Sequence, residues 1–223
     1  MLNVLIISMV LAGVNPQDTT VSKKDSVALA QLKDTTVVAA RSVSPEAEEE
    51  ISKSVVITHI KFKGIPVDGS MNLFGKRLEQ EGFQRINTAN FAGTFAGIEK
   101  AQIHCHSISG NVWKVSVWFP AQLTWNEVKT RYMKFKDLLV WKYVVNPVVV
   151  KEQLSGKYRE GSGQEAWGFE NGTSEYCSVF EFLEGDIIQY IVFDKPSGGL
   201  RVCIDYVDRV NSILKDESDM MDL

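Results

Sequence analysis

The chain contains the same local pattern twice: a helix with clear start signals, followed by a run of short alternating segments. The first predicted helix begins near Asp68-Gly69-Ser70, passes through Phe74 and ends at Gly82. The second begins at Thr124-Trp125-Asn126-Glu127, which reads as a capping box, and continues to Lys142. Short turns between strands require antiparallel pairing. The pattern therefore predicts an α+β fold of two helix-plus-antiparallel-strands repeats, with the helices packed on an antiparallel sheet.

The distribution of aromatic residues sets the limits of the folded region. Every Phe, Trp and Tyr lies between Phe62 and Tyr206. Large apolar side chains are what a core is made of. We therefore predict an α+β domain with internal duplication over residues 55–215, and roughly 160 residues are enough for a sizeable core.

The N-terminus has the character of an export signal. Residues Leu2 to Gly13 form an apolar stretch that is too short to span a bilayer, and Val10-Leu11-Ala12 offers a cleavage site. No Lys or Arg precedes Lys23, which departs from the usual signal, and a buried strand or helix is the alternative. We predict a signal peptide over residues 1–13, export to the periplasm or the extracellular space, and no membrane span in the mature chain.

The segments that flank the folded region are polar. Residues 14–54 end in Ser44-Pro45-Glu46-Ala47-Glu48-Glu49-Glu50 and contain no aromatic residue. Such a segment buries too little apolar surface to offset the entropy of ordering it, so we predict a disordered linker. Residues 216–223 read as a solvated acidic tail.

Strand candidates surround both helices. Residues 55–67 open with alternation, because Ile60 and Phe62 fall on one face, and this indicates a half-buried strand. Three candidates follow the first helix: 91–97, 101–108 and 111–119. Four follow the second helix: 165–169, 175–182, 186–193 and 200–206. A short closing helix is predicted over residues 207–214.

The segment 111–119 alternates most clearly. One face is expected to carry Trp113, Val115, Val117 and Phe119. Trp118 then points away from that face, and an exposed Trp118 beside Trp125 would suit contact with a ligand or a protein partner. A second packed layer explains Trp118 as well and is the more ordinary interpretation.

His104-Cys105-His106 is the only histidine cluster in the chain. On a strand both imidazoles point to the same side, as two ligands of a metal site would. A third ligand would have to come from His59 or a distant carboxylate. The ordinary alternative is two exposed strand residues beside a buried Cys105.

The three cysteines, Cys105, Cys177 and Cys203, leave at least one thiol unpaired. In a simple meander, the strand 186–193 separates Cys177 from Cys203 by two strand spacings, about 9.6 Å. A disulfide needs Cα atoms within about 7 Å. A meander therefore predicts free thiols. Adjacent residues on a strand face opposite sides, so Cys105 cannot form a catalytic dyad with either neighbouring histidine.

Other classes of function lack their parts. The formal net charge of −4 argues against general affinity for nucleic acid. Gly161-Ser162-Gly163 lacks the following Lys and helix start of a phosphate-binding loop, and no cofactor is predicted. Lysines and arginines around the second helix form a basic face, which either is solvated or contacts an acidic partner.

Three motifs carry a resemblance to a known group of proteins. They are Phe62-Lys63-Gly64-Ile65-Pro66-Val67-Asp68-Gly69, Phe91-Ala92-Gly93-Thr94-Phe95-Ala96-Gly97 and Val112-Trp113-Lys114-Val115. Over residues 58–215 the chain resembles a family of uncharacterised exported proteins from gut Bacteroidetes, which implies export but no particular activity. The duplicated pattern is also similar in topology to the tandem repeat of secreted β-lactamase inhibitor proteins, and this likeness carries no function.

These observations favour an exported, non-catalytic binding module for an unknown protein or small ligand, with Trp118 and Trp125 as candidate contacts. A metal-dependent hydrolase using His104 and His106 is one alternative. An envelope-associated structural protein, in which residues 14–54 act as a spacer, is the other.

Overall fold

The computed structural model describes residues 58–213 and residue 215. The chain divides into two units, Met1–Val55 and Val56–Leu223, and all described residues belong to the second. The predicted signal peptide, linker and acidic tail lie outside the described residues. Among the helices that the structure describes, none is long and apolar enough to cross a membrane.

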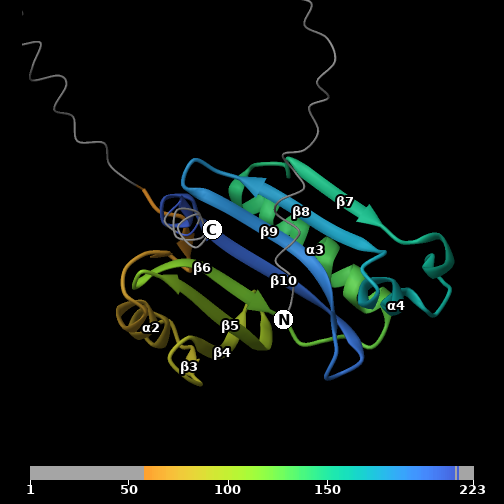
Figure 1. The fold of residues 1–223 in the computed structure, drawn as a ribbon, viewed down its shortest axis with the longest axis horizontal. Helices are drawn as coiled ribbons and strands as arrows, with labels where there is room; N and C mark the ends of the chain where they lie inside the picture. Colours follow the sequence, from red (N-terminus) through yellow and green to blue (C-terminus); the bar gives the residue numbers. More distant parts are fainter. Residues whose placement is uncertain (1–57, 214, 216–223) are drawn as a thin grey trace, which may run out of the picture. The chain divides into compact units, whose positions relative to one another are not determined.

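An antiparallel sheet of eight strands forms the centre of the domain. The strands are β3 (Gln84–Arg85), β4 (Asn90–Phe95), β5 (Ile98–Ile108), β6 (Asn111–Trp118), β7 (Val149–Gln153), β8 (Glu175–Glu181), β9 (Gly185–Asp194) and β10 (Gly199–Asp208). Their order across the sheet is β3-β4-β5-β6-β10-β9-β8-β7 (Figure 1). Each half of the chain thus supplies a four-stranded meander, and β6 pairs with β10 where the halves meet. The α+β class is confirmed.

A helix precedes each meander: α2 (Met71–Gln80) comes before β3, and α3 (Trp125–Tyr143) comes before β7. The 3₁₀ turn η2 (Gly156–Tyr158) and the short α4 (Glu165–Glu170) lie between β7 and β8. The Ser70 hydroxyl accepts the Leu73 amide at the start of α2. At the start of α3, Thr124 and Glu127 form the predicted capping box, because each side chain accepts the backbone amide of the other. Residues 209–213 form the predicted closing helix.

Helix α3 packs against one face of the sheet. Its stripe Val128, Tyr132, Phe135 and Leu139 is buried, as the spacing predicts. The Tyr132 hydroxyl is hydrogen-bonded to Ser178 Oγ of β8 at 2.7 Å, and Gln189 Nε2 of β9 donates to the Tyr132 carbonyl at 2.6 Å. These two buried hydrogen bonds fix the position of α3 relative to strands β8 and β9.

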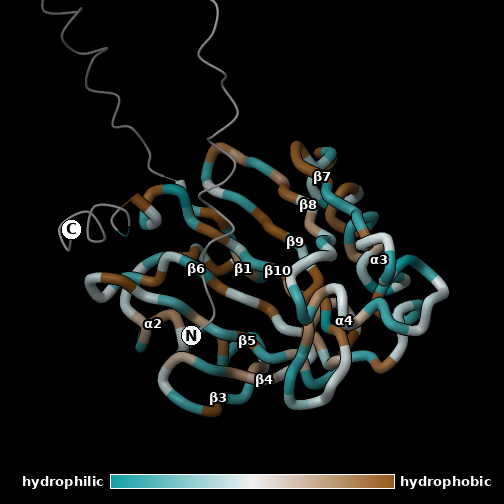
Figure 2. The backbone as a smooth tube through the Cα atoms, turned by 45° about the vertical axis from the view of Figure 1, so that its right-hand side comes forward, coloured by the Kyte–Doolittle hydropathy of each residue, from teal (hydrophilic) through white to brown (hydrophobic). Residues whose placement is uncertain are grey.

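Helices α2 and α4 lie beside the sheet, so the expectation that the helices pack on the sheet holds only for α3. Helix α2 contacts β2, β3 and β6, and α4 contacts β9 and η2. Figures 1 and 2 show α2 near β3 and α4 at the other end of the domain. Helix α2 buries only Phe74, Gly75 and Leu78, so its apolar stripe is too short to extend over several strands.

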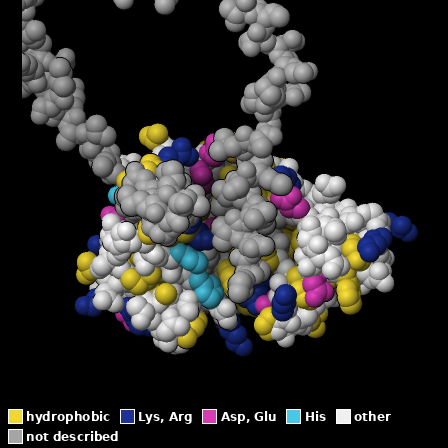
Figure 3. Space-filling view, viewed as in Figure 1, with side chains coloured by type: hydrophobic (Ala, Val, Ile, Leu, Met, Phe, Trp, Pro, Cys, Tyr) yellow, Lys and Arg dark blue, Asp and Glu magenta, His cyan; other side chains and the backbone are white. Residues whose placement is uncertain are grey.

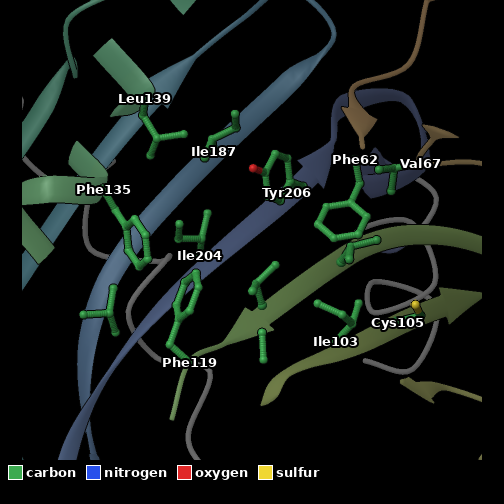
Figure 4. Close-up of a cluster of buried hydrophobic side chains, with 14 of the residues drawn as sticks. Phe62, Val67, Ile103, Cys105, Phe119, Phe135, Leu139, Ile187, Ile204 and Tyr206 are labelled. Atoms are coloured by element: carbon green, nitrogen blue, oxygen red, sulfur yellow. The ribbon is translucent and has the colours of Figure 1, made fainter. Parts of the chain in front are cut away.

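The core lies between α3, the sheet and the first described residues. Phe62 stacks on Phe95 with ring centroids 5.3 Å apart and meets the edge of Tyr206 at the same distance. Phe119 and Phe135 have centroids 4.3 Å apart. Figure 4 shows Phe62 beside Tyr206 and Phe119 beside Phe135 within this core. The chain beginning at residue 58 therefore belongs to the same core as β10.

The start and end of the described region are joined by buried polar groups. Asp208 accepts the Ile60 amide at 3.1 Å, and its other oxygen caps the closing helix at the Asn211 amide, 2.8 Å away. His59 lies 3.1 Å from the same Asp208 carboxylate. This network fixes residues that are about 150 positions apart in the sequence.

The predicted strand over residues 55–67 is shorter than expected. The structure has only β1 (Lys61–Phe62) and β2 (Ile65–Pro66), which pair with each other outside the main sheet. The predicted alternation is confirmed, since Ile60 and Phe62 are buried and Lys61 is exposed. The segment reverses at Lys63-Gly64, where both residues have positive φ, and so ends before it can join the larger sheet.

After α3, one predicted strand was wrong and one strand was missed. Residues 165–169 form helix α4, because the buried positions Glu165 and Gly168 recur at a helical spacing. A side chain on Gly168 would collide with Ser174, so this turn depends on glycine. Strand β7 was not predicted, because it is an edge strand whose exposed side chains give no alternating signal.

Trp113 does not share the face of Val115. The pairing of β5 with β6 shifts register between His106 and Ser107, and this bulge puts Val112 rather than Trp113 into the core. The predicted alternation of strand 111–119 therefore holds only from Lys114 onward.

Candidate functional site

The face of the sheet opposite α3 carries the two histidines of β5 together with polar side chains of β6 and β10. Residues directly paired across strands share a face, and Ile103, Val117 and Ile204 form one such row in the core. Their neighbours along the strands point the other way. We call this second surface the polar face and define it by His104, His106, Ser116, Trp118, Arg201 and Asp205. Figure 3 shows histidine side chains at the surface over β5 and β6.

Trp118 lies at the centre of a polar cluster. The His104 ring packs against it from β5 with centroids 4.5 Å apart. The Arg201 guanidinium lies over its ring from β10, 5.3 Å from the centroid. Arg201 also forms an ion pair with Asp194, which neutralises its charge. Among the described residues, the indole is therefore flanked by a guanidinium and an imidazole.

Three buried nitrogens in this cluster have no hydrogen-bond partner among the described residues. They are His104 Nε2, Trp118 Nε1 and Arg201 Nε. His104 Nδ1 lies 2.8 Å from Asn90 Oδ1, so the tautomer that satisfies this bond leaves Nε2 as an acceptor. The tryptophan and arginine nitrogens can only donate. The cluster thus offers two donors and one acceptor around a single ring, where most buried polar groups would be satisfied.

A second chain of polar groups runs beside Trp118. His106 Nε2 is 3.2 Å from Ser116 Oγ, and Asp205 is paired directly across from Ser116. The Tyr190 hydroxyl donates to Asp205 at 3.3 Å, and Lys114 lies 3.6 Å from the same carboxylate. Like the Arg201 and Asp194 pair, this group balances one positive charge with one negative charge.

Burial controls the titration of this face. It lowers the pKa of His106 to about 4, with Lys114 and His104 adding repulsion. It also lowers the pKa of His104, helped by the charge of Arg201. Burial raises the pKa of Asp205, and Lys114 offsets part of that rise. Both imidazoles are therefore neutral at pH 7.

Ser116 and His106 resemble part of a hydrolytic triad but lack its arrangement. A triad needs a carboxylate on the far nitrogen of the histidine. Here Asp205 lies beside the serine instead, and Ser116 is buried with 3% of its surface exposed. A substrate carbonyl could not approach this hydroxyl. The pair does not form a nucleophile with its base.

The predicted metal ligands do lie on one face, but with separate partners. His104 is directed to Asn90 and His106 to Ser116. Within residues 58–213, no group of three or more His, Cys, Asp and Glu side chains is arranged to hold a metal ion. The described region therefore supplies this pair without the third protein ligand that a zinc site normally has.

The thiols are unsuited to nucleophilic chemistry. Cys105, Cys177 and Cys203 are all free. Burial raises the pKa of Cys177 to about 11 and that of Cys105 to about 12, and it raises the pKa of Cys203 well above its usual range. A thiolate is the reactive form, so none of these cysteines is activated at neutral pH.

The two predicted tryptophan contacts are not brought together. Trp125 belongs to the core on the α3 side, with its ring 5.0 Å from Tyr176 and 7% of its surface exposed. Only Trp118 lies on the polar face. The strongly exposed tryptophans are Trp141 and Trp167, at 81% and 59%. The sequence offered a signal for Trp141, because it falls on α3 away from the apolar stripe.

No protein-family model, curated protein or solved structure matches this chain. The resemblances to exported Bacteroidetes proteins and to the β-lactamase inhibitor repeat therefore stay predictions.

Proposed function

We propose that the chain is an exported, non-catalytic binding module that contacts a ligand or protein partner through the polar face. The observation that carries this proposal is the set of three unpartnered nitrogens around Trp118. An unsatisfied buried donor or acceptor costs about 1–3 kcal/mol. Because the three nitrogens are buried in the free chain, a partner that supplies two acceptors and one donor recovers that free energy only if these side chains turn toward it on binding.

The lack of activated groups supports binding over catalysis. The histidines of the polar face are held neutral, the serine is buried and the thiols are protonated. The charges of Arg201 and Lys114 are each matched by a carboxylate. Such a surface favours an uncharged polar contact, because a charged ligand would meet no uncompensated charge.

The finer architecture is part of the proposal. In each half of the chain a helix precedes four antiparallel strands, α2 before β3 to β6 and α3 before β7 to β10. This order supports an internal duplication. Export to the periplasm or the extracellular space rests on residues 1–13 and on the resemblance given above.

Native mass spectrometry of the protein purified from the cells that export it tests the binding role. We expect a co-purifying mass whose occupancy falls about tenfold in Trp118→Phe, since that change removes one hydrogen-bond donor and keeps an aromatic ring. Trp167→Phe is the matched control, because Trp167 is exposed on α4 and outside the polar face. Equal occupancy in the two variants would contradict the proposed contact.

A metal site at His104 and His106 is the second candidate, because both imidazoles lie on the polar face of β5. Zinc or iron measured in the same purified protein separates the two. A stoichiometric metal that is lost in the variant His104→Ala/His106→Ala would favour a metal-dependent enzyme over a non-catalytic binding module.

A further inference from the structure

The outer side of α3 presents an open surface that the proposed binding role does not use. Six of its residues are Thr130, Met133, Lys134, Asp137, Leu138 and Trp141. They recur at steps of three and one, so they form one stripe along the helix. This stripe lies opposite the buried stripe that packs on the sheet. Apart from Met133, which is half-buried and packs against the core, the described elements leave it exposed.

Two of the five basic residues of this helix are paired with carboxylates. Lys129 pairs with Glu160 at 2.8 Å, and Lys136 pairs with Glu152 at 2.6 Å. On the stripe itself, an acidic partner would meet one cation without a carboxylate partner among the described residues. Lys134 and Asp137 differ, because both are exposed and neither forms an ion pair within the described residues. They leave one positive and one negative charge on the stripe.

The apolar part of the stripe is unusual for a surface helix. Trp141 is the most exposed tryptophan of the described region, and Leu138 is exposed as well. Met133 is half-buried beside them. Tryptophan contributes strongly to protein interfaces when it is buried against a partner. A partner that covers this stripe must offer apolar side chains together with one positive and one negative charge.

We propose that the α3 stripe docks the same stripe of a second copy, antiparallel and around a two-fold axis. In that arrangement Lys134 lies opposite the partner's Asp137, and Met133 lies opposite the partner's Leu138. Trp141 lies opposite the partner's Thr130. Each pair occurs twice, since a two-fold interface is self-complementary. Antiparallel helices packed in this way meet at axial distances of about 8–10 Å.

Charge complementarity selects a second copy as the occupant. Two antiparallel copies of any stripe with this spacing can be superposed position on position, but the residues that then face each other need not be complementary. In this chain Lys134 faces Asp137, and Met133 faces Leu138. Because α3 and the polar face lie on opposite sides of the sheet, the dimer leaves both polar faces free. The particle is then bivalent for whatever that face binds.

Sedimentation velocity on the full chain over a range of concentrations tests the interface. We expect the wild type to associate as a dimer. Lys134→Asp sets two carboxylates opposite each other at both contacts, and Asp137→Lys sets two ammonium groups there. Each single variant should weaken dimerisation at least tenfold, because like charges face each other twice.

Four further samples make the test specific to this pairing. A mixture of the two single variants should form a heterodimer, because each contact again joins opposite charges. The variant Lys134→Asp/Asp137→Lys should dimerise like the wild type. Trp141→Ala should weaken the dimer, whereas Trp167→Ala, on α4, should leave it unchanged. Circular dichroism confirms that every variant is folded.

A wild type that stays monomeric at every concentration overturns the proposal. So does a dimer whose affinity is the same in both single charge reversals, because it must then use another surface. Failure of the mixed variants to associate also rejects the antiparallel pairing. None of these outcomes bears on the ligand of the polar face, which native mass spectrometry tests separately.

Discussion

Cys177 and Cys203 are both cross-strand partners of Tyr190, one on each side of strand β9. Two strand spacings put their Cα atoms about 9.6 Å apart, beyond the roughly 7 Å that a disulfide allows. The meander inferred from sequence is confirmed, and with it the free state of the cysteines. The chain keeps its thiols apart by topology.

Oxidation should therefore leave the protein without a disulfide between these residues. We expect thiol titration in denaturant to find three free thiols after storage in air. In the folded protein Cys177 should react first and slowly, because burial raises its pKa to about 11 while Cys203 is fully buried. A Cys177–Cys203 peptide in mass spectrometry would show that the strand order is wrong.

Removing the Tyr132 hydroxyl should weaken the packing of α3 against the sheet. Tyr132→Phe leaves the Ser178 hydroxyl buried without its partner at 2.7 Å, so we expect a loss of about 1–2 kcal/mol in urea unfolding. Adding Ser178→Ala removes the unsatisfied group and should recover part of the loss. A double variant less stable than the single one would contradict this account.

Asn211 should be one of the most sensitive polar positions. Its side-chain amide donates toward the Val67 carbonyl, the Asp68 carboxylate and the Val112 carbonyl, at 3.2, 2.9 and 3.0 Å. Asn211→Ala should cost about 2–3 kcal/mol of unfolding free energy. Asn211→Asp should cost at least as much at neutral pH, because a carboxylate would then face three oxygens. Ser212→Ala, at a half-buried neighbour whose hydroxyl donates only to the Arg209 carbonyl of its own turn, should cost less, about 0.5 kcal/mol.

Stability should fall as the pH drops from 6.5 toward 4, in part because of His106. Burial lowers its pKa from 6.5 to about 4, so the unfolded chain binds a proton in this range that the folded protein does not. The stabilisation is complete above pH 6.5 and is lost as the pH falls through the folded pKa. We expect about 2 kcal/mol after allowing for partial solvent screening.

Urea unfolding of the wild type and of His106→Gln at several pH values isolates this contribution. The difference in stability between them should shrink by that amount from pH 7 to pH 4, while other titrating groups cancel. A difference that does not change with pH would show that His106 titrates normally in the folded protein.

Local signals accounted for the parts of the fold that depend on neighbours in sequence. The capping box at Thr124 and Glu127 and the stripe ending at Leu139 are readable because a helix is closed by residues three and four apart. Strands β8 to β10 were found because alternation marks a half-buried strand. The edge strand β7 has mostly exposed side chains and was invisible for that reason.

The polar face could be predicted only in part. His104, His106 and Trp118 were recognisable as unusual residues, yet Arg201 and Asp205 lie about one hundred positions away along the chain. Their contact depends on the pairing of β6 with β10, which joins the ends of the two meanders. The bulge at His106 and Ser107 also moved Trp113 off its expected face, and no local pattern announces such a shift.

Local periodicity was enough to predict where α2 and α3 begin and which residues of α3 face the core, because these depend on side chains that are close in sequence. Which distant strands become neighbours could not be predicted in this way. That pairing set Arg201 against Trp118, kept Trp125 in the core and left Trp141 at the surface. The physical reason is that strand pairing is made by backbone groups common to every residue, so the partner of a strand is chosen by the packing of the whole chain.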